Sequence, residues 1–414
     1  MNTHRPRFIA GLGLGLAAIL GLSACAAPGE TASTGSSGSA SESAASAESA
    51  QPRVSLTYDG GLYVLNGETL ALEADLPLAG FNRLNSSGDG RHVLVTTEAG
   101  FQVLDTGTWT DEAGDHYQAD PELTDLVFDA SAAGHVVRHG GKTILFADGT
   151  GETTIFDTNA LLENPTELPE VETIEAEAAH HGVSIVLEDN TVLSTLGTAD
   201  GRTGIRVLDA DRTEVTRNED CPSVHGEGAA ANEISVFGCS NGVLVYDAGE
   251  ITKITSPDAY GRVGNIFTTD DSALVLGDYN SNPDSEGYLL TEIILVDTVA
   301  KTANVVDLPA GISYTFRDLA RGPEGEALIL GSDGSLHILD PETGAITSSI
   351  PVIDAWEGPV EWQDAHPALI VVGDIAYVTE PATNSVHSVD LTTGEVAATA
   401  ELPSTPNEIA VVTG

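Results

Sequence analysis

Three segments of the chain carry histidines that could bind a metal ion. The first contains His135 and His139, the second contains the adjacent pair His180 and His181, and the third contains His225. A neutral imidazole is a good ligand for Zn²⁺, which usually takes four ligands in a tetrahedron with metal–nitrogen bonds of roughly 2.0 to 2.1 Å. We therefore expect a zinc site, with the alternative that each histidine is a hydrogen-bonded residue at the end of a strand.

The expected ligand set has a core and several secondary candidates. A carboxylate or a water molecule could complete a histidine site, because zinc accepts both. An acidic turn at residues 111–120 places one histidine among four acids, although a solvated loop has the same composition. The expected ligands are His135, His139, His180 and His225, and the secondary candidates are His181, His116, Asp115 and Glu227.

The sequence lacks the common motifs of catalysis. It contains no Gly-x-Ser-x-Gly elbow, no phosphate-binding Gly-rich loop and no His-Glu-x-x-His pair. Pairs of acids are plentiful in a chain with 63 Asp and Glu residues, so they do not single out a glycosidase site. We expect a binding protein and not an enzyme.

The elements that must position these residues are short β-strands. From residue 53 onward, runs of Val, Ile, Leu and Tyr alternate with polar residues and Gly-containing turns, and no long stretch keeps a helical period. One apolar strand that closes on Asp or Asn recurs eight times, and its closing residues lie 39, 52, 52, 38, 50, 43 and 50 positions apart. The repeats are residues 62–66, 101–105, 154–157, 205–209, 243–247, 293–297, 336–340 and 386–390.

This period is typical of a β-propeller, in which each blade is a four-stranded antiparallel sheet of about 40 to 50 residues. We expect a single all-β propeller over residues 53–414 with eight blades, and seven blades plus a hairpin is the alternative. The apolar C-terminal residues 407–412 should supply a strand to the first blade, which starts near Val54, and so close the ring.

A propeller would bring histidines from distant segments together. The innermost strand of each blade lines the central channel, so residues at the start of these strands converge on the axis. By this reasoning three successive blades place His135, His180 or His181, and His225 near the channel, and later blades place Arg262 and Arg317 there.

The N-terminus has the features of an export signal. Arg5 and Arg7 precede an apolar stretch at residues 8–22, which is too short to span a bilayer, and Leu-Ser-Ala-Cys ends at Cys25. This pattern resembles a bacterial lipobox, so we expect residues 1–24 to be a signal peptide and Cys25 to be lipidated. Residues 25–52, rich in Ala, Ser and Gly, should form a disordered tether outside the cytoplasmic membrane. An ordinary secretory signal is the alternative.

Charge and cysteine content restrict the partners. Without residues 1–24 the chain has 14 Lys and Arg against 63 Asp and Glu, a formal charge of −49, which repels nucleic acid. In an oxidising compartment, Cys221 and Cys239 should form a disulfide. A soft metal site that uses both thiolates is the alternative.

Several segments resemble the exported zinc metallochaperones called AztD. The segments include Gly-Phe-Gln-Val-Leu-Asp at 100–105, His-His-Gly-Val at 180–183 and Cys-Pro-Ser-Val-His-Gly-Glu at 221–227, and others lie at 88–95, 135–142, 313–317 and 405–408. The resemblance implies a monomeric propeller that binds zinc and delivers it to the solute-binding protein of a zinc ABC transporter. Family members often carry a histidine-rich loop, whereas the acidic turn here holds only His116. The competing hypothesis is a lipid-anchored scaffold with structural histidines.

Overall fold

Short apolar runs form antiparallel β-strands throughout the computed structural model, which describes residues 44–285 and 287–414. The predicted signal peptide, Cys25 and the first part of the predicted tether lie outside these residues. Helical structure in the described part is confined to α1 (Ala160–Glu163) and the 3₁₀ turns η1 (Ala231–Glu233) and η2 (Pro381–Thr383). Within that part, no helix is both long and apolar enough to cross a membrane.

Most strands belong to eight four-stranded antiparallel sheets. Four of them, each given from its first strand to its fourth, are β35 (Ile409–Val412), β2 (Arg53–Tyr58), β3 (Gly60–Asn66), β4 (Leu72–Leu78); β5 (Leu84–Ser86), β6 (His92–Thr97), β7 (Gly100–Asp105), β10 (Glu122–Asp129); β11 (Ala133–His139), β12 (Lys142–Ala147), β13 (Glu152–Asp157), β14 (Glu172–Ile174); and β15 (Ser184–Val186), β16 (Val192–Thr198), β17 (Gly201–Leu208), β18 (Glu214–Asn218).

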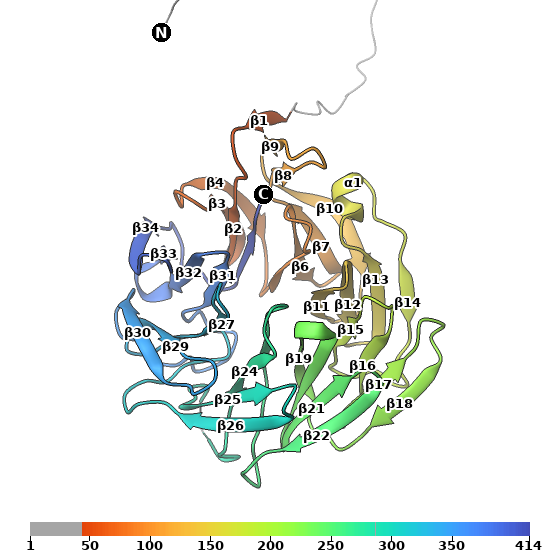
Figure 1. Ribbon diagram of the computed structural model, residues 1–414. Coiled ribbons are helices and arrows are strands. Elements are labelled where there is room, and N and C mark those ends of the chain that lie inside the picture. The colour runs from red at the N-terminus through yellow and green to blue at the C-terminus, as the bar shows by residue number, and fades with distance from the viewer. Residues whose placement is uncertain (1–43, 286) are drawn as a thin grey trace, which may run out of the picture. The chain divides into compact units, whose positions relative to one another are not determined.

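The other four sheets follow in chain order. They are β19 (His225–Ala230), β20 (Ile234–Cys239), β21 (Gly242–Asp247), β22 (Glu250–Thr255); β23 (Ile266–Phe267), β24 (Leu274–Tyr279), β25 (Glu292–Asp297), β26 (Thr302–Asp307); β27 (Leu319–Arg321), β28 (Ala327–Leu330), β29 (Ser335–Leu339), β30 (Ile346–Pro351); and β31 (Leu369–Val372), β32 (Ile375–Glu380), β33 (Ser385–Asp390), β34 (Glu395–Glu401). Figure 1 shows these sheets following one another around a common centre, which is a propeller-like arrangement.

The repeated segment recognised in the sequence is the third strand of every sheet. In six of the eight sheets the closing residue has a local role, because its side chain accepts hydrogen bonds from the backbone of the turn that follows. The Oδ1 atom of Asp297 accepts from the N–H groups of Val299 at 2.9 Å and Ala300 at 2.8 Å. Asp390 makes the same contacts with the two residues after Leu391. These turns end six of the eight third strands at a defined residue, as Asx-turns do.

The C-terminal strand pairs with the first sheet, as the sequence predicts. β35 runs antiparallel to β2, with Arg53 opposite Val412 and Leu56 opposite Ile409. The last residues of the domain thus cover an edge of the strand with which it begins, and that edge is not left open to another chain.

The apolar core lies between neighbouring sheets. Val192 and Ile205 of one sheet share a cluster with Phe237 and Leu244 of the next, and all four are fully buried. Burial of such a side chain contributes about 1.5 to 3 kcal/mol relative to exposure. Every sheet is held by its neighbours in this way, so the ends of the first strands have fixed positions relative to one another.

A separate three-stranded sheet includes residues expected to belong to the tether. β8 (Thr108–Thr110) and β9 (His116–Gln118) form a hairpin inserted before β10, and β1 (Ala45–Ala47) pairs with β9. Residues 45–47 fall in the range expected to be a disordered tether, yet they form a strand. The free edge of β9 explains the difference, because backbone N–H and C=O groups there can pair with any extended segment.

Candidate metal centre

Three histidines from three successive sheets converge. His135 lies on β11, His181 precedes β15, and His225 is the first residue of β19. One ring nitrogen of each lies within 4.8 Å of the others, and the Nε2 atoms of His181 and His225 are 3.0 Å apart. Ligand nitrogens in a tetrahedral zinc site are about 3.3 Å apart at bond lengths of roughly 2.0 to 2.1 Å. A small movement would therefore bring the three nitrogens to bonding distance of one ion.

Backbone carbonyls orient two of the three rings. The Nδ1 atom of His135 lies 2.8 Å from the carbonyl oxygen of Gly182, and that of His225 bonds to the carbonyl oxygen of Gly264. Because a carbonyl only accepts, each Nδ1 must carry the proton, and each Nε2 keeps its lone pair. This is the tautomer that a metal site needs.

A carboxylate orients the third ring. The Nδ1 atom of His181 lies 2.6 Å from Oδ2 of Asp148, whose other oxygen accepts the backbone N–H of Gly182 at 3.3 Å. Carboxylate–histidine pairs of this kind fix the ring and raise its basicity as a ligand. Asp148 is thus a positioning residue, and the sequence analysis missed it because it lies 33 positions from its partner.

Close packing fixes the backbone that supplies these acceptors. A Cβ atom at Gly182 would collide with the hydroxyl of Thr195 and the rings of His180 and Phe146, so only glycine fits there. The loop at Gly264 is held by Asp278, a buried carboxylate that accepts the backbone N–H groups of residues 264 and 265.

The environment keeps two of the imidazoles neutral. Burial is the main cause that lowers the pKa of His225 to about 3 and the pKa of His135 well below its ordinary value of 6.5. Neighbouring positive groups add to this effect, including Arg83 for His135 and Arg202 for His225. A neutral ring whose Nδ1 carries the proton can bind a metal through Nε2 without losing a proton.

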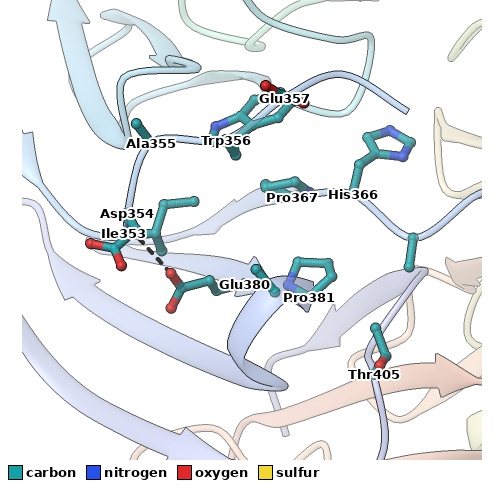
Figure 2. Close-up of a pocket in the computed structure, with 12 residues that line it drawn as sticks. Ile353, Asp354, Ala355, Trp356, Glu357, His366, Pro367, Glu380, Pro381 and Thr405 are labelled. Carbon is teal, nitrogen blue, oxygen red and sulfur yellow. Dashed lines mark hydrogen bonds between the residues drawn. The ribbon is translucent and has the colours of Figure 1, made fainter. Parts of the chain in front are cut away.

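Two cavities meet at the cluster. One of about 540 Å³ is bordered by all three histidines, and a second of about 340 Å³ is bordered by His135, His225 and Glu227. A cavity of about 580 Å³ lies elsewhere, around Trp356 and His366 (Figure 2). It contains no group of metal ligands, since the three-histidine cluster is the one such group among residues 44–285 and 287–414.

Comparison with known proteins finds similarity to a zinc chaperone. No family model matches the chain. The zinc chaperone AztD of Citrobacter koseri is 25% identical over 358 residues, which cover 83% of each protein. Two structures of C. koseri AztD, one of them the apo form, match with a TM-score of 0.73 and 21% identity over 88% of this chain and 98% of theirs.

The chain is AztD-like. Its fold is that of the AztD structures, and the sequence resemblance covers most of its length. The fold is also shared with an enzyme, the dihydro-heme d1 dehydrogenase NirN, at a TM-score of 0.56 and 14% identity over 87% of this chain and 74% of that one. Fold alone therefore does not decide the activity of the AztD-like chain.

Of the four expected ligands, the structure brings His135 and His225 to the cluster. The third member is His181, the second residue of the adjacent pair, and not His180. His180 is only 4% exposed, and its nitrogens contact the carbonyl of Ala178 at 2.8 Å and the hydroxyl of Thr195 at 3.0 Å. It is a satisfied core residue, because both of its ring nitrogens have hydrogen-bond partners and its side chain is buried.

The fourth expected ligand, His139, lies at the far end of its strand. Four residues of extended chain separate it from His135 by about 13 Å. Its Nε2 atom lies 2.8 Å from a carboxylate oxygen of Glu233, in the turn η1. The structure therefore does not place His139 at the cluster.

The structure places the secondary candidate ligands in different parts of the protein. Glu227 borders the smaller cavity beside two of the histidines, and burial raises the pKa of its carboxyl to about 8. His116 and Asp115 lie on the β8–β9 hairpin, outside the cluster. There the Nδ1 atom of His116 contacts the hydroxyl of Thr110 at 2.7 Å. Of these three, Glu227 alone borders a cavity that histidines of the cluster also border.

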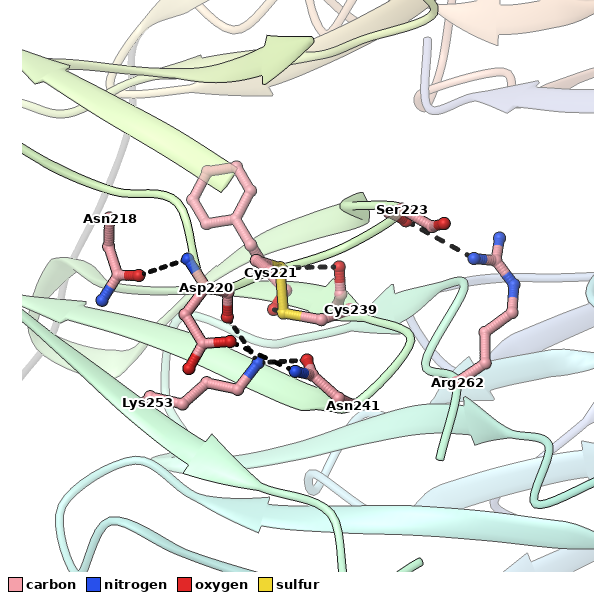
Figure 3. The surroundings of a disulfide bond; sticks show 10 residues. Asn218, Asp220, Cys221, Ser223, Cys239, Asn241, Lys253 and Arg262 are labelled. Carbon is pink, nitrogen blue, oxygen red and sulfur yellow. Dashed lines mark hydrogen bonds between the residues drawn. A yellow bond between two sulfur atoms is a disulfide. The ribbon is translucent and has the colours of Figure 1, made fainter. Parts of the chain in front are cut away.

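The predicted disulfide between Cys221 and Cys239 is confirmed (Figure 3). It joins the segment before β19 to the end of β20, and the backbone N–H of Val224 bonds to the carbonyl of Cys221 at 3.2 Å. The residue after Val224 is His225. The bond thus braces the segment that presents one of the three imidazoles.

Proposed function

We propose that this protein binds Zn²⁺ through His135, His181 and His225 and acts as a zinc metallochaperone. The observation that carries the proposal is the convergence of three imidazoles whose Nδ1 atoms are all held by oxygen acceptors. Three imidazole nitrogen donors in one place suit zinc better than the hard cations Mg²⁺ or Ca²⁺, which take oxygen ligands.

Delivery needs a site that can exchange its metal. Three protein ligands leave the fourth tetrahedral position open to water or to a ligand from a partner. The side chain of His181 is 44% exposed, so a partner could approach from its side. Because the relative from C. koseri is named a zinc chaperone, we propose that the acceptor is the solute-binding protein of a zinc ABC transporter.

We further propose that residues 53–414 form a closed eight-bladed propeller. Eight four-stranded sheets and the pairing of β35 with β2 support this architecture. Closure would keep the starts of the first strands at fixed spacing around the axis, which a site shared among three sheets requires.

The location proposed for the protein is the outer face of the cytoplasmic membrane, where a lipidated Cys25 would anchor a monomer. The lipobox pattern supports this location, and the Cys221–Cys239 disulfide is in keeping with an oxidising compartment. We also propose a binding role and not a catalytic one, because the sequence lacks the common motifs of catalysis.

Two measurements, zinc binding by the purified protein and zinc transfer to a partner, test this function. The purified chain should take up one equivalent of zinc per protein in competition with a zinc-binding dye, and should then pass it to a zinc-free solute-binding protein. The control variant His337→Ala should bind zinc as the wild type does, because His337 is buried and hydrogen-bonded in β29, outside the cluster. Wild-type protein that takes up no zinc would overturn the proposal and favour a scaffold with structural histidines.

A further inference from the structure

Arginines gather beside the three histidines. Arg83, Arg202 and Arg262 border the cavity of about 540 Å³ that the histidines also border. The chain has only 16 Lys and Arg residues against 63 Asp and Glu, so three guanidinium groups on one cavity wall stand against its overall composition. An excess of positive charge next to a cation site needs an explanation.

These guanidinium groups have few protein partners. Within residues 44–285 and 287–414, the side chain of Arg202 makes no hydrogen bond or ion pair, and Arg262 makes one long contact of 3.4 Å with the carbonyl of Ser223. Arg83 lies 3.8 Å from Glu408, whose carboxylate also pairs with Arg317. Most of the N–H donors of these cavity-lining arginines therefore have no partner among the described residues.

No carboxylate of the cavity wall is free to neutralise them. Asp278 is the one acid among the described residues that border this cavity. Its oxygens already accept the backbone N–H groups of Gly264 and Asn265 and, at 2.7 Å, the side-chain amide of Asn265. Among the described residues of its wall, the cavity thus presents three guanidinium groups and one carboxylate, and that carboxylate is already hydrogen-bonded.

We propose that this cavity binds a carboxylate, held by Arg202 and Arg262, which becomes the fourth ligand of the zinc ion. Its coupling to zinc rests on the proposed function. Zinc accepts a carboxylate oxygen at roughly 2.0 to 2.2 Å, and the planar guanidinium fork matches a carboxylate with two parallel N–H donors. One carboxylate would thus satisfy the open coordination position and the unpartnered donors together.

The size and walls of the cavity suit more than a lone ion. Its volume of about 540 Å³ lies in the range of small-molecule sites, and Phe316 and Trp362 supply apolar wall. A free small dicarboxylate and the carboxylate side chain of a protein segment share the required chemistry. The experiment therefore uses both sources.

Zinc affinity is measured by dye competition in the presence of acetate, succinate or a blocked Ala-Glu-Ala peptide. Each measurement is compared with one in chloride at equal ionic strength and is corrected for zinc that the carboxylate binds in solution. The proposal predicts that at least one carboxylate raises zinc affinity by about tenfold, a typical coupling between two ligands. The most effective anion identifies the source. The gain should vanish in the double variant Arg202→Gln with Arg262→Gln.

Two controls separate charge from fold. Arg217→Gln removes an arginine whose partners are surface glutamates, and it should keep the full gain. Arg202→Lys keeps the charge but loses the fork, and it should keep only part of the gain. Unchanged zinc affinity in every carboxylate, with normal zinc binding in chloride, would overturn the carboxylate site and leave the proposed function intact.

Calorimetry of the zinc-free protein with succinate gives the second readout. Binding should be weaker than with zinc present, and the double variant should abolish it. If wild-type protein bound no zinc, the proposed function would fail, and the carboxylate site would stand or fall on this titration alone.

Discussion

Adjacent residues His180 and His181 should respond to alanine substitution in opposite ways. His181 points to the cluster and bonds to Asp148, whereas His180 points into the core beside Phe146 and Thr195. One substitution should therefore remove zinc binding without unfolding the protein, and the other should destabilise the protein while zinc binding survives.

The expected loss in His181→Ala follows from its place in the site. Removal of a residue that only orients a ligand typically costs 10- to 100-fold in metal affinity. Loss of the ligand itself should cost at least about 100-fold, which corresponds to about 3 kcal/mol. The free energy of unfolding without zinc should fall by only about 0.5 to 1.5 kcal/mol, because the substitution removes one hydrogen bond, to Asp148, from a side chain that is 44% exposed.

The expected loss in His180→Ala comes from buried contacts. The substitution removes two hydrogen bonds, of 2.8 Å and 3.0 Å, each with a net contribution of about 0.5 to 1.5 kcal/mol. It also removes an edge-on contact with the ring of Phe146, at a centroid distance of 5.3 Å, which is worth about 0.5 to 1.5 kcal/mol. The free energy of unfolding should fall by about 2 to 4 kcal/mol, and zinc affinity by less than about tenfold.

Dye competition for zinc and urea unfolding of the metal-free protein are the two assays. Each variant should fail in only one of them. Equal zinc affinity in His181→Ala and wild type, or a greater loss in His180→Ala than in His181→Ala, would refute the assignment of the second histidine of the pair to the metal site.

Four further predictions test the surrounding structure. Asp148→Asn should weaken zinc binding about 10- to 100-fold, because an amide is a poorer acceptor than a carboxylate for the N–H of the His181 ring. Dye competition measures this loss, and a zinc affinity equal to that of the wild type would contradict the prediction. Replacement of both Cys221 and Cys239 by Ala should lower the free energy of unfolding by about 3 kcal/mol, since the bond closes a loop with a sequence separation of 18, and an unchanged urea midpoint would contradict this. Burial raises the pKa of Asp318 to about 8, above its unfolded value near 3.9, so the contribution of this group to stability falls as pH rises from about 4 through 8. Asp318→Asn should lack that fall, and a wild-type-minus-variant difference that is the same at every pH would refute it. Cys25→Ala should release a folded protein from the membrane fraction, and retention after a high-salt wash would argue against the lipid anchor.

The sequence predicts the sheets well because their signals are local. An apolar strand followed by an Asp or Asn that caps its own turn is complete within about eight residues, so each copy is visible without knowledge of the rest. The strand β1 could not be predicted in this way. Its pairing partner, β9, lies about 70 positions away, and residues 45–47 are Ala and Ser, which have no strong strand preference.

The metal centre could be predicted in part for a similar reason. Equivalent positions in successive repeats pointed to His135 and His225, but the choice within the adjacent pair depends on the direction of the chain just before β15, where no regular alternation applies. Asp148 and Arg202 join the site from turns and a third strand, and only the folded arrangement brings them there.

Anomalous diffraction at the zinc edge from a zinc-soaked crystal tests the central claim most directly. The account predicts one strong peak bonded to the Nε2 atoms of His135, His181 and His225 at roughly 2.0 to 2.1 Å, with Asp148 still bonded to Nδ1 of His181. A peak bonded instead to His180 or His139, or at the hairpin of His116 with none at the cluster, would contradict it.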